Sequence, residues 1–355
     1  DQAKRVKQLV WGEDRVGEFL WKTTSRISRY AANRIPEIAD TVVEIDNAIK
    51  WGFGWTIGVF EAWDAIGLER SVERMRHEGQ AVPANIEQML ASGARSFYKD
   101  ENGEHFFYDL VAGEYRPVPP RPGVLILKDV KERNGVIKTN PGASLIDLGD
   151  GVACLEFHSK MNSLGTDTVA MMNFAIDEVE RNFKGLVVGN QGGTFSVGAN
   201  LMMLLLAAQE EEWDDINMMV RALQNAVMRL RYSSRPVVTA PFGMTFGGGC
   251  EITLHGNTVR AAAETYIGLV EVGVGVIPAG GGTKEMTMRA SDAWAKVPDA
   301  DPVAFLKRTF ETIGMGKVAT SAQEARELGF LRDSDAISMN GDRLIQDAKQ
   351  EVLNM

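Results

Sequence analysis

Apolar and polar residues follow a helical period over the first quarter of the chain. Apolar positions recur three or four residues apart, the spacing that places them on one helix face. These positions are Val6, Leu9, Val10, Ile35, Ile38, Val42, Ile45 and Ile49. The pattern predicts helices over residues 1 to about 92. Aromatic and turn-forming residues follow between 95 and 115, where Phe106 to Tyr108 predict a short hairpin.

From about residue 140 the pattern changes to short apolar runs that alternate with helical stretches. Strands are expected over 144–148, 152–157, 185–188, 237–240 and 259–261, and helices over 168–183, 213–231 and 322–328. Such alternation is typical of an α/β domain. Between the two patterns, Arg116 to Gly123 is rich in proline, which cannot continue a helix or a central strand. We therefore expect a helical domain (1–115), a linker (116–143) and an α/β domain (144–355).

Composition and charge narrow the class of protein. The chain has 355 residues, enough for two cores, and its 45% hydrophobic and 24% charged residues exclude wholesale disorder. A net charge of −10 argues against a nucleic-acid or anionic-membrane partner. Two cysteines cannot build a disulfide framework, no signal peptide is visible, and the longest apolar run, Leu201 to Ala208, is too short to cross a bilayer. We expect a cytoplasmic protein and, since the chain does not begin with methionine, a piece of a longer one.

Glycine-rich segments hold the candidate chemistry. They span 192–201, 246–251 and 268–282, and Glu251 and Glu271 lie within the last two. Glycine lets the backbone approach a ligand and aim its N–H groups at it. Two such N–H groups can form an oxyanion hole, and two carboxylates can hold and deprotonate a water. The nucleotide-binding ending Gly-Lys-Ser/Thr is absent, and the four histidines lack metal-ligand spacing, so no metal site is predicted.

Residues from about 146 to 355 resemble the crotonase (enoyl-CoA hydratase/isomerase) superfamily. The motifs that carry the resemblance occur at 160–164, 195–199, 247–251, 277–282, 322–325 and 328–331. Two departures are Asn200, where Asp is common, and Ala279, where Gly is common. The C-terminal end is also short, and the family's further helices there help to cover the acyl site and to build trimers.

The resemblance implies the spiral α/β fold of crotonase and ClpP, and a role for each matched residue. The N–H groups of Ala199 and Gly248 would form the oxyanion hole, and Glu251 and Glu271 would be catalytic. Contacts to coenzyme A are implied for Lys160, Ser163 and Val197. The run Leu201 to Leu206 is interpreted either as a core helix or as a wall of an acyl tunnel.

Residues 1–115 resemble the C-terminal, all-helical repeat of 3-hydroxyacyl-CoA dehydrogenases. The carriers lie at 32–35, 44–48, 50–55 and 60–64. The order of the two domains is similar to that of bacterial bifunctional enzymes of fatty-acid β-oxidation. No Gly-x-Gly-x-x-Gly follows a strand, so the NAD-binding domain is missing and dehydrogenase activity is not expected. NAD would be needed only by a full-length parent.

The function implied by these resemblances is enoyl-CoA hydration. Water would add to a 2-enoyl-CoA thioester, coenzyme A entering as part of the substrate, with no separate cofactor. A Δ3–Δ2-enoyl-CoA isomerase, which needs a single base, and a non-catalytic docking piece stay open as alternatives. Expected partners are the missing dehydrogenase domains and, by resemblance to the family, further copies in a trimer.

Overall fold

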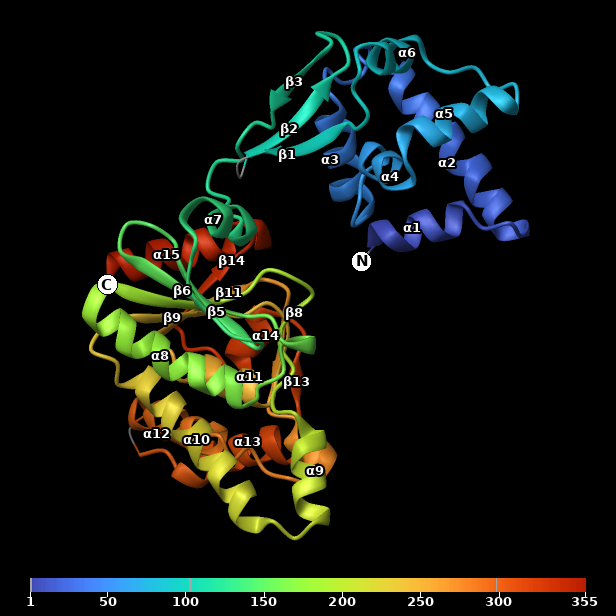
Figure 1. Cartoon of the computed structure of the whole chain (residues 1–355). Coiled ribbons are helices and arrows are strands. Elements are labelled where there is room, and N and C mark those ends of the chain that lie inside the picture. The colour runs from blue at the N-terminus through green and yellow to red at the C-terminus, as the bar shows by residue number, and fades with distance from the viewer. Residues whose placement is uncertain (1, 102–103, 298) are drawn as a thin grey trace. The chain divides into compact units, whose positions relative to one another are not determined.

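The computed structural model describes residues 2–101, 104–297 and 299–355. It divides into two compact units, unit 1 over residues 1–120 and unit 2 over residues 121–355 (Figure 1). Each unit has its own hydrophobic core.

Unit 1 consists of helices followed by a small sheet. The helices are α1 (Gln2–Val10), α2 (Arg15–Asn33), α3 (Val42–Phe53), α4 (Val59–Ile66), α5 (Leu68–His77) and α6 (Ala84–Ala91). The antiparallel sheet consists of β1 (Tyr98–Glu101), β2 (Glu104–Asp109) and β3 (Glu114–Pro117). The Asp64 carboxylate on α4 accepts hydrogen bonds from the N–H groups of Phe97 (2.8 Å) and Tyr98 (2.9 Å), which ties β1 to the helices. The unit is therefore mainly helical but not all-α, and the expected hairpin is part of its sheet.

Unit 2 alternates strands and helices. Its strands are β4 (Val136–Thr139), β5 (Ala143–Asp147), β6 (Val152–Phe157), β7 (Gly185–Gly189), β8 (Thr194–Ser196), β9 (Val237–Ala240), β10 (Gly243–Phe246), β11 (Thr258–Ala262), β12 (Thr265–Gly268), β13 (Val318–Ala319) and β14 (Ala336–Ser338). Its α-helices are α7 (Leu127–Asn134), α8 (Thr166–Asn182), α9 (Leu201–Gln209), α10 (Trp213–Arg231), α11 (Gly248–Leu254), α12 (Gly282–Ala295), α13 (Pro302–Gly314), α14 (Ala322–Glu327) and α15 (Leu344–Asn354). Three short 3₁₀ helices are η1 (Lys160–Asn162), η2 (Glu271–Val274) and η3 (Gly341–Arg343).

The strands of unit 2 form two sheets. One has the order β14-β11-β9-β7-β6-β5-β4 and the other the order β13-β12-β10-β8. Successive strands alternate between them, since β7, β9 and β11 lie in the first sheet and β8, β10 and β12 in the second. The chain thus winds as a spiral, and each turn leaves one strand in each sheet.

The predicted linker differs from the structure. Unit 1 ends at Pro120, inside the proline-rich segment, but residues 121–143 include α7 and β4. Strand β4 pairs with β5, and Leu127 of α7 is buried in the core. The linker prediction of 116–143 is therefore too long. Every residue of β4 is exposed, and its sequence Val-Ile-Lys-Thr lacks the alternation of apolar and polar residues that indicates a strand.

Helix α9 was expected to be either a core helix or a wall of an acyl tunnel. It is formed by the apolar run from Leu201, yet Ala207 is its only buried residue. The interpretation as a core helix is therefore wrong. Among the described residues, every helix is too short or too polar to span a lipid bilayer.

Candidate active site

Two loops of unit 2 approach each other beside Leu164. The Leu164 N–H donates to the Gly198 carbonyl (2.8 Å), and the Asn200 N–H donates to the Leu164 carbonyl (3.2 Å). These bonds make a parallel bridge between Leu164 and Ala199. Because successive N–H groups of an extended chain point to opposite sides, the Ala199 N–H points away from Leu164.

Gly248, the first residue of α11, lies directly against this loop. A methyl group added at Gly248 would lie 3.6 Å from the Ala199 nitrogen, and one added at Gly198 would lie 2.8 Å from the Gly248 nitrogen. Gly247, with φ +52°, makes the turn into the helix. Within the described part of the chain, neither the Ala199 N–H nor the Gly248 N–H donates to a protein acceptor. Both N–H groups are thus available to an outside acceptor.

Glu251, one helical turn into α11, carries a buried carboxylate. The residue is 2% exposed, and its Oε1 accepts a hydrogen bond of 2.8 Å from the Gly282 N–H. A methyl group at Gly280 would lie 2.3 Å from Glu251 Oε2, so the turn at 280–282 lies directly on the carboxylate. Burial raises the pKa of Glu251 to about 7, opposed by the bond from Gly282 and reinforced by the charge of Glu271.

Glu271 opens η2 and presents a carboxylate with an unused oxygen. Its Oε1 lies 3.3 Å from the position that a methyl group at Gly247 would take. Its Oε2 is buried, with no hydrogen-bond partner among the described residues. Burial raises the pKa of Glu271 above its ordinary value. The two carboxylates thus differ, because Glu251 accepts the N–H of the distant Gly282, whereas the backbone N–H that acts on the Glu271 carboxylate is its own.

Comparison with known proteins identifies the fold of unit 2. Residues 147–296 match the family model for "Enoyl-CoA hydratase/isomerase". The solved structure of enoyl-CoA hydratase from Bacillus halodurans superposes with a TM-score of 0.51 at 16% identity, over 60% of this chain and 79% of that one. Unit 2 is a crotonase-fold domain.

Two longer relatives match this chain, one over nearly all of its length and the other over most of it. A "Probable 3-hydroxyacyl-CoA dehydrogenase" of Bacillus subtilis is 49% identical over 346 residues, which are 98% of this chain and 43% of the relative. A "Putative fatty acid oxidation complex trifunctional enzyme" of Rickettsia felis is 25% identical over 80% of this chain and 36% of its own length. The chain therefore spans less than half the length of each.

The residues expected to contact coenzyme A gather next to the Ala199 loop of the crotonase-fold unit. Lys160 is the first residue of η1 and is exposed, and Ser163 directly follows the end of η1. Val197 is half-buried and lies two residues before Ala199. Side chains of the two segments join them, since Ser196 Oγ donates to the Asn162 carbonyl at 2.7 Å. The structure places these three residues on adjoining segments, and their contact with coenzyme A stays a prediction.

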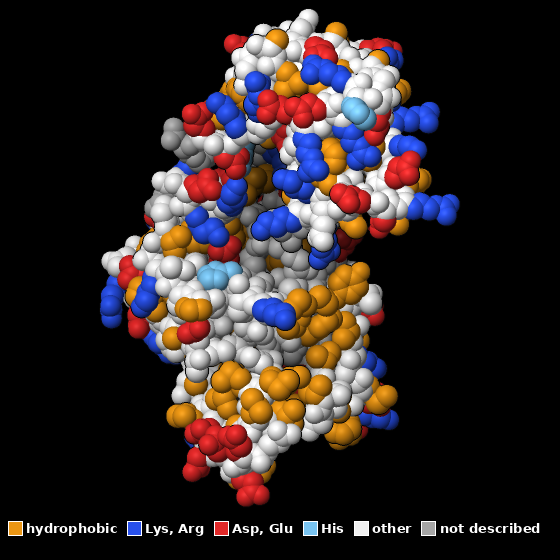
Figure 2. Space-filling view, turned by 45° about the vertical axis from the view of Figure 1, so that its right-hand side comes forward, with side chains coloured by type: hydrophobic (Ala, Val, Ile, Leu, Met, Phe, Trp, Pro, Cys, Tyr) orange, Lys and Arg blue, Asp and Glu red, His pale blue; other side chains and the backbone are white. Residues whose placement is uncertain are grey.

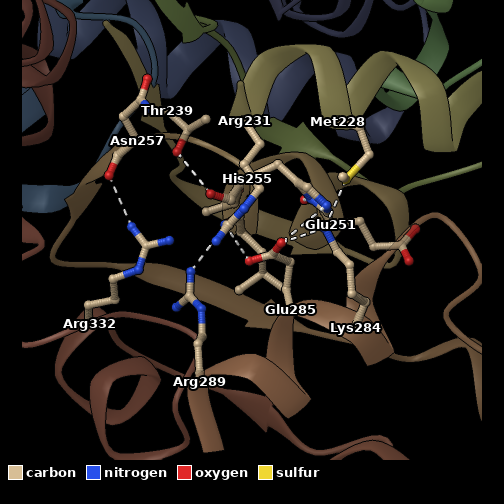
Figure 3. Close-up of polar contacts among 12 residues, drawn as sticks. Met228, Arg231, Thr239, Glu251, His255, Asn257, Lys284, Glu285, Arg289 and Arg332 are labelled. Carbon is tan, nitrogen blue, oxygen red and sulfur yellow. Dashed lines mark hydrogen bonds and ion pairs between the residues drawn. The ribbon is translucent and has the colours of Figure 1, made fainter. Parts of the chain in front are cut away.

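A buried polar cluster behind Glu251 was missed by sequence reasoning (Figure 3). His255 Nδ1 lies 2.6 Å from the Glu251 carbonyl oxygen, and Glu285 forms ion pairs of 2.7 Å with both Arg231 and Lys284. In the sequence, His255 stands out only as one of four histidines without metal-ligand spacing. Its position four residues after Glu251, on the same helix face, was the available signal.

The surroundings of Cys250 disfavour a nucleophilic role. Its side chain is fully buried, and burial, followed by the charges of Glu271 and Glu251, raises the pKa of its thiol. A thiol that stays protonated is a poor nucleophile.

Proposed function

We propose that the crotonase-fold unit adds water to 2-enoyl-CoA thioesters and releases 3-hydroxyacyl-CoA. The observation that supports this most directly is the pair of carboxylates, those of buried Glu251 and half-buried Glu271, whose charges interact beside two available N–H groups. Attack of water on C3 of a conjugated thioester moves negative charge onto the thioester oxygen. The N–H groups of Ala199 and Gly248 would stabilise that oxygen, and removal of one such donor typically costs about 10²–10³ in rate.

The two glutamates would handle the protons. One takes a proton from the attacking water, and the other delivers a proton to C2, so that H and OH add across the double bond. Both roles need a pair that holds one proton near neutral pH, and the raised pKa values of both residues support that state. Coupled carboxylates titrate as a pair, so the proposal concerns the pair and not the order of its members.

One observation favours the isomerase alternative. Glu251 already accepts the Gly282 N–H, whereas Glu271 has a free carboxylate oxygen. A single free base beside an oxyanion hole is sufficient to move a proton between C2 and C4 of a 3-enoyl-CoA.

We further propose that the chain works alongside dehydrogenase chemistry in fatty-acid β-oxidation. The product of hydration, a 3-hydroxyacyl-CoA, is the class of substrate named for the Bacillus subtilis relative. Unit 1 resembles the helical repeat of such dehydrogenases, which supports a shared polypeptide.

The test compares Glu251→Gln and Glu271→Gln in crotonyl-CoA hydration and 3-enoyl-CoA isomerisation. Glutamine keeps the size and one acceptor oxygen but can neither take up nor release the proton. We expect each change to lower hydration by about 10² or more. Exposed Glu264, changed to glutamine, is the matched control and should keep parental rates.

Each outcome of this comparison has a distinct meaning. Loss of isomerisation only in Glu271→Gln, with little hydration in the parent, would favour the isomerase. Near-parental hydration by Glu271→Gln would contradict the two-carboxylate mechanism. Absence of both reactions in the parent chain would favour a docking piece.

A further inference from the structure

His255 is a fully buried histidine whose proton position is set by its surroundings. It caps the end of α11, and its Nδ1 lies 2.6 Å from the Glu251 carbonyl oxygen. A carbonyl oxygen can only accept, so Nδ1 must carry a proton and donate it. The ring therefore holds the backbone of the residue whose side chain is proposed to handle a substrate proton.

Burial favours the neutral form of the ring, and the Glu285 carboxylate near it is shared with two cations. On the far side, Nε2 lies 3.5 Å from Glu285 Oε1, and that carboxylate is already neutralised by Arg231 of α10 and Lys284 of α12. Arg289, also on α12, donates to the Leu254 carbonyl next to His255. A charged imidazolium would thus add a further cation to a buried site. Burial lowers the pKa of His255 to about 4, and the charge of Glu285 opposes this shift without reversing it.

The same ring lies against the glycine turn that holds Glu251. A methyl group at Gly281 would lie 2.7 Å from His255 Cε1, so only glycine permits this approach, and its φ is +119°. The two neighbouring glycines lie against the Glu251 side chain, since a methyl group at Gly280 would lie 2.3 Å from its Oε2 and the Gly282 N–H donates to its Oε1. Helix α11 thus presents two side chains, four residues apart, to three consecutive glycines.

We propose that His255 is a positioning residue for Glu251. Its ring anchors the Glu251 carbonyl and supports Gly281, which keeps the Gly282 N–H directed at the Glu251 carboxylate. Figure 3 shows Glu285, Arg231 and Lys284 gathered next to the ring. This inference rests on the proposed function of Glu251, although the ring itself touches no substrate.

The variants His255→Leu and His255→Asn separate positioning from packing. Leucine fills the space without donating, whereas asparagine can donate to the Glu251 carbonyl in place of Nδ1. We expect His255→Leu to lower kcat for crotonyl-CoA hydration roughly 10- to 100-fold, with KM changed less than about 3-fold. His255→Asn should recover most of that loss, and His77→Leu, an exposed histidine of unit 1, should leave both constants unchanged. Parental kcat in a folded His255→Leu protein would overturn the proposal.

A second readout does not depend on catalysis. In protein with ¹³C-labelled glutamate carboxyl groups, the signal that disappears in Glu251→Gln belongs to Glu251. Because the Gly282 N–H stabilises the carboxylate, a displaced turn should move the titration of Glu251 to higher pH in His255→Leu and less so in His255→Asn. An unchanged titration would overturn the positioning role. If the parent chain catalyses nothing while this titration moves as expected, the proposed function fails and the positioning of Glu251 stands.

Thermal unfolding controls for the fold. If His255→Leu does not fold, His255→Asn alone carries the test, together with the ¹⁵N signals of the histidine rings. We expect one ring, absent from His255→Asn, to stay neutral with its proton on Nδ1 down to about pH 5. A ring that titrates near the ordinary histidine pKa, or that carries its proton on Nε2, would contradict the anchoring.

Discussion

Glu251 keeps a carboxylate where a negative charge is unfavourable. Its pKa of about 7 lies above the usual glutamate value of 4.5, so the native state binds a proton more tightly than the unfolded state. The stabilising effect of that proton is complete below about pH 4.5 and is lost as pH rises through 7.

Glu251→Gln should therefore stabilise unit 2 at high pH relative to the parent. The amide keeps an acceptor for the Gly282 N–H but never becomes charged. The gain should grow between about pH 4.5 and 7 and then level off, at no more than about 3 kcal/mol. Urea unfolding at several pH values measures it, and Glu264→Gln, on the surface, should show no such trend. A difference from the parent that is constant with pH would contradict the burial argument.

Ala199→Pro tests the oxyanion hole on the backbone itself. Proline removes the Ala199 N–H, and Ala199 is exposed, so the ring does not have to enter a core. We expect crotonyl-CoA hydration to fall by roughly 10² or more, with acyl-CoA binding affected far less. Circular dichroism and the thermal midpoint must match the parent. Full activity in a folded variant would place the oxyanion hole on another loop.

The sequence indicates which residues are candidates better than it indicates which hydrogen bonds and ion pairs those residues form. The glycines that precede Glu251 and those that flank Glu271 were sufficient to single out both residues. Their unequal surroundings were not predictable, because Gly282 reaches Glu251 from 31 positions further along the chain. The Glu285 cluster was missed for the same reason, since its ion pair with Arg231 joins α10 to α12.

At the scale of elements, the glycine turn at 280–282 packs against the Glu251 carboxylate and fixes its position. A methyl group at Gly280 would lie 2.3 Å from Glu251 Oε2 and 2.9 Å from Leu223 Cδ2. Since its backbone is not left-handed, alanine there acts through size and not through φ.

Gly280→Ala should displace the Glu251 carboxylate and lower hydration by about 10². The matched control is Gly273→Ala in η2, where an added methyl group meets nothing within 4 Å. Initial rates of the two variants decide the point. Equal rates for both variants would mean that the turn does not position Glu251.

Elements with a strong apolar pattern were predicted well. The ranges expected for β6, β9 and α10 match those of the structure, and α8 differs by a residue or two at its ends. The elements not predicted include α7, β4, α12, α13 and α15, and the interpretation of α9 as a core helix failed because this strongly apolar helix is exposed. In Figure 2, apolar side chains gather on the lower part of the view, over unit 2. Two strongly exposed apolar residues of this unit are Met202 of α9 (61% exposed) and Phe310 of α13 (76% exposed). Periodicity reports which residues are apolar but not whether another element covers them.

At the scale of the whole molecule, the two units have separate cores. All residues of the unit 1 core lie at or before Val118. All residues of the three core clusters of unit 2 lie at or after Leu125. We expect residues 121–355, expressed alone, to fold cooperatively and to keep the hydration rate within about 3-fold, because every proposed catalytic residue lies in that range. Calorimetry and initial rates check both statements. A soluble but inactive unit 2 would show that unit 1 is needed for catalysis.

Turnover of crotonyl-CoA by the purified chain tests the central claim most directly. The loss of the conjugated thioester absorbance follows hydration, and product analysis identifies 3-hydroxybutyryl-CoA. We predict turnover by the parent chain and its near-complete loss in Glu271→Gln, with acyl-CoA binding retained. Binding of the thioester without any hydration above the uncatalysed rate would contradict the account.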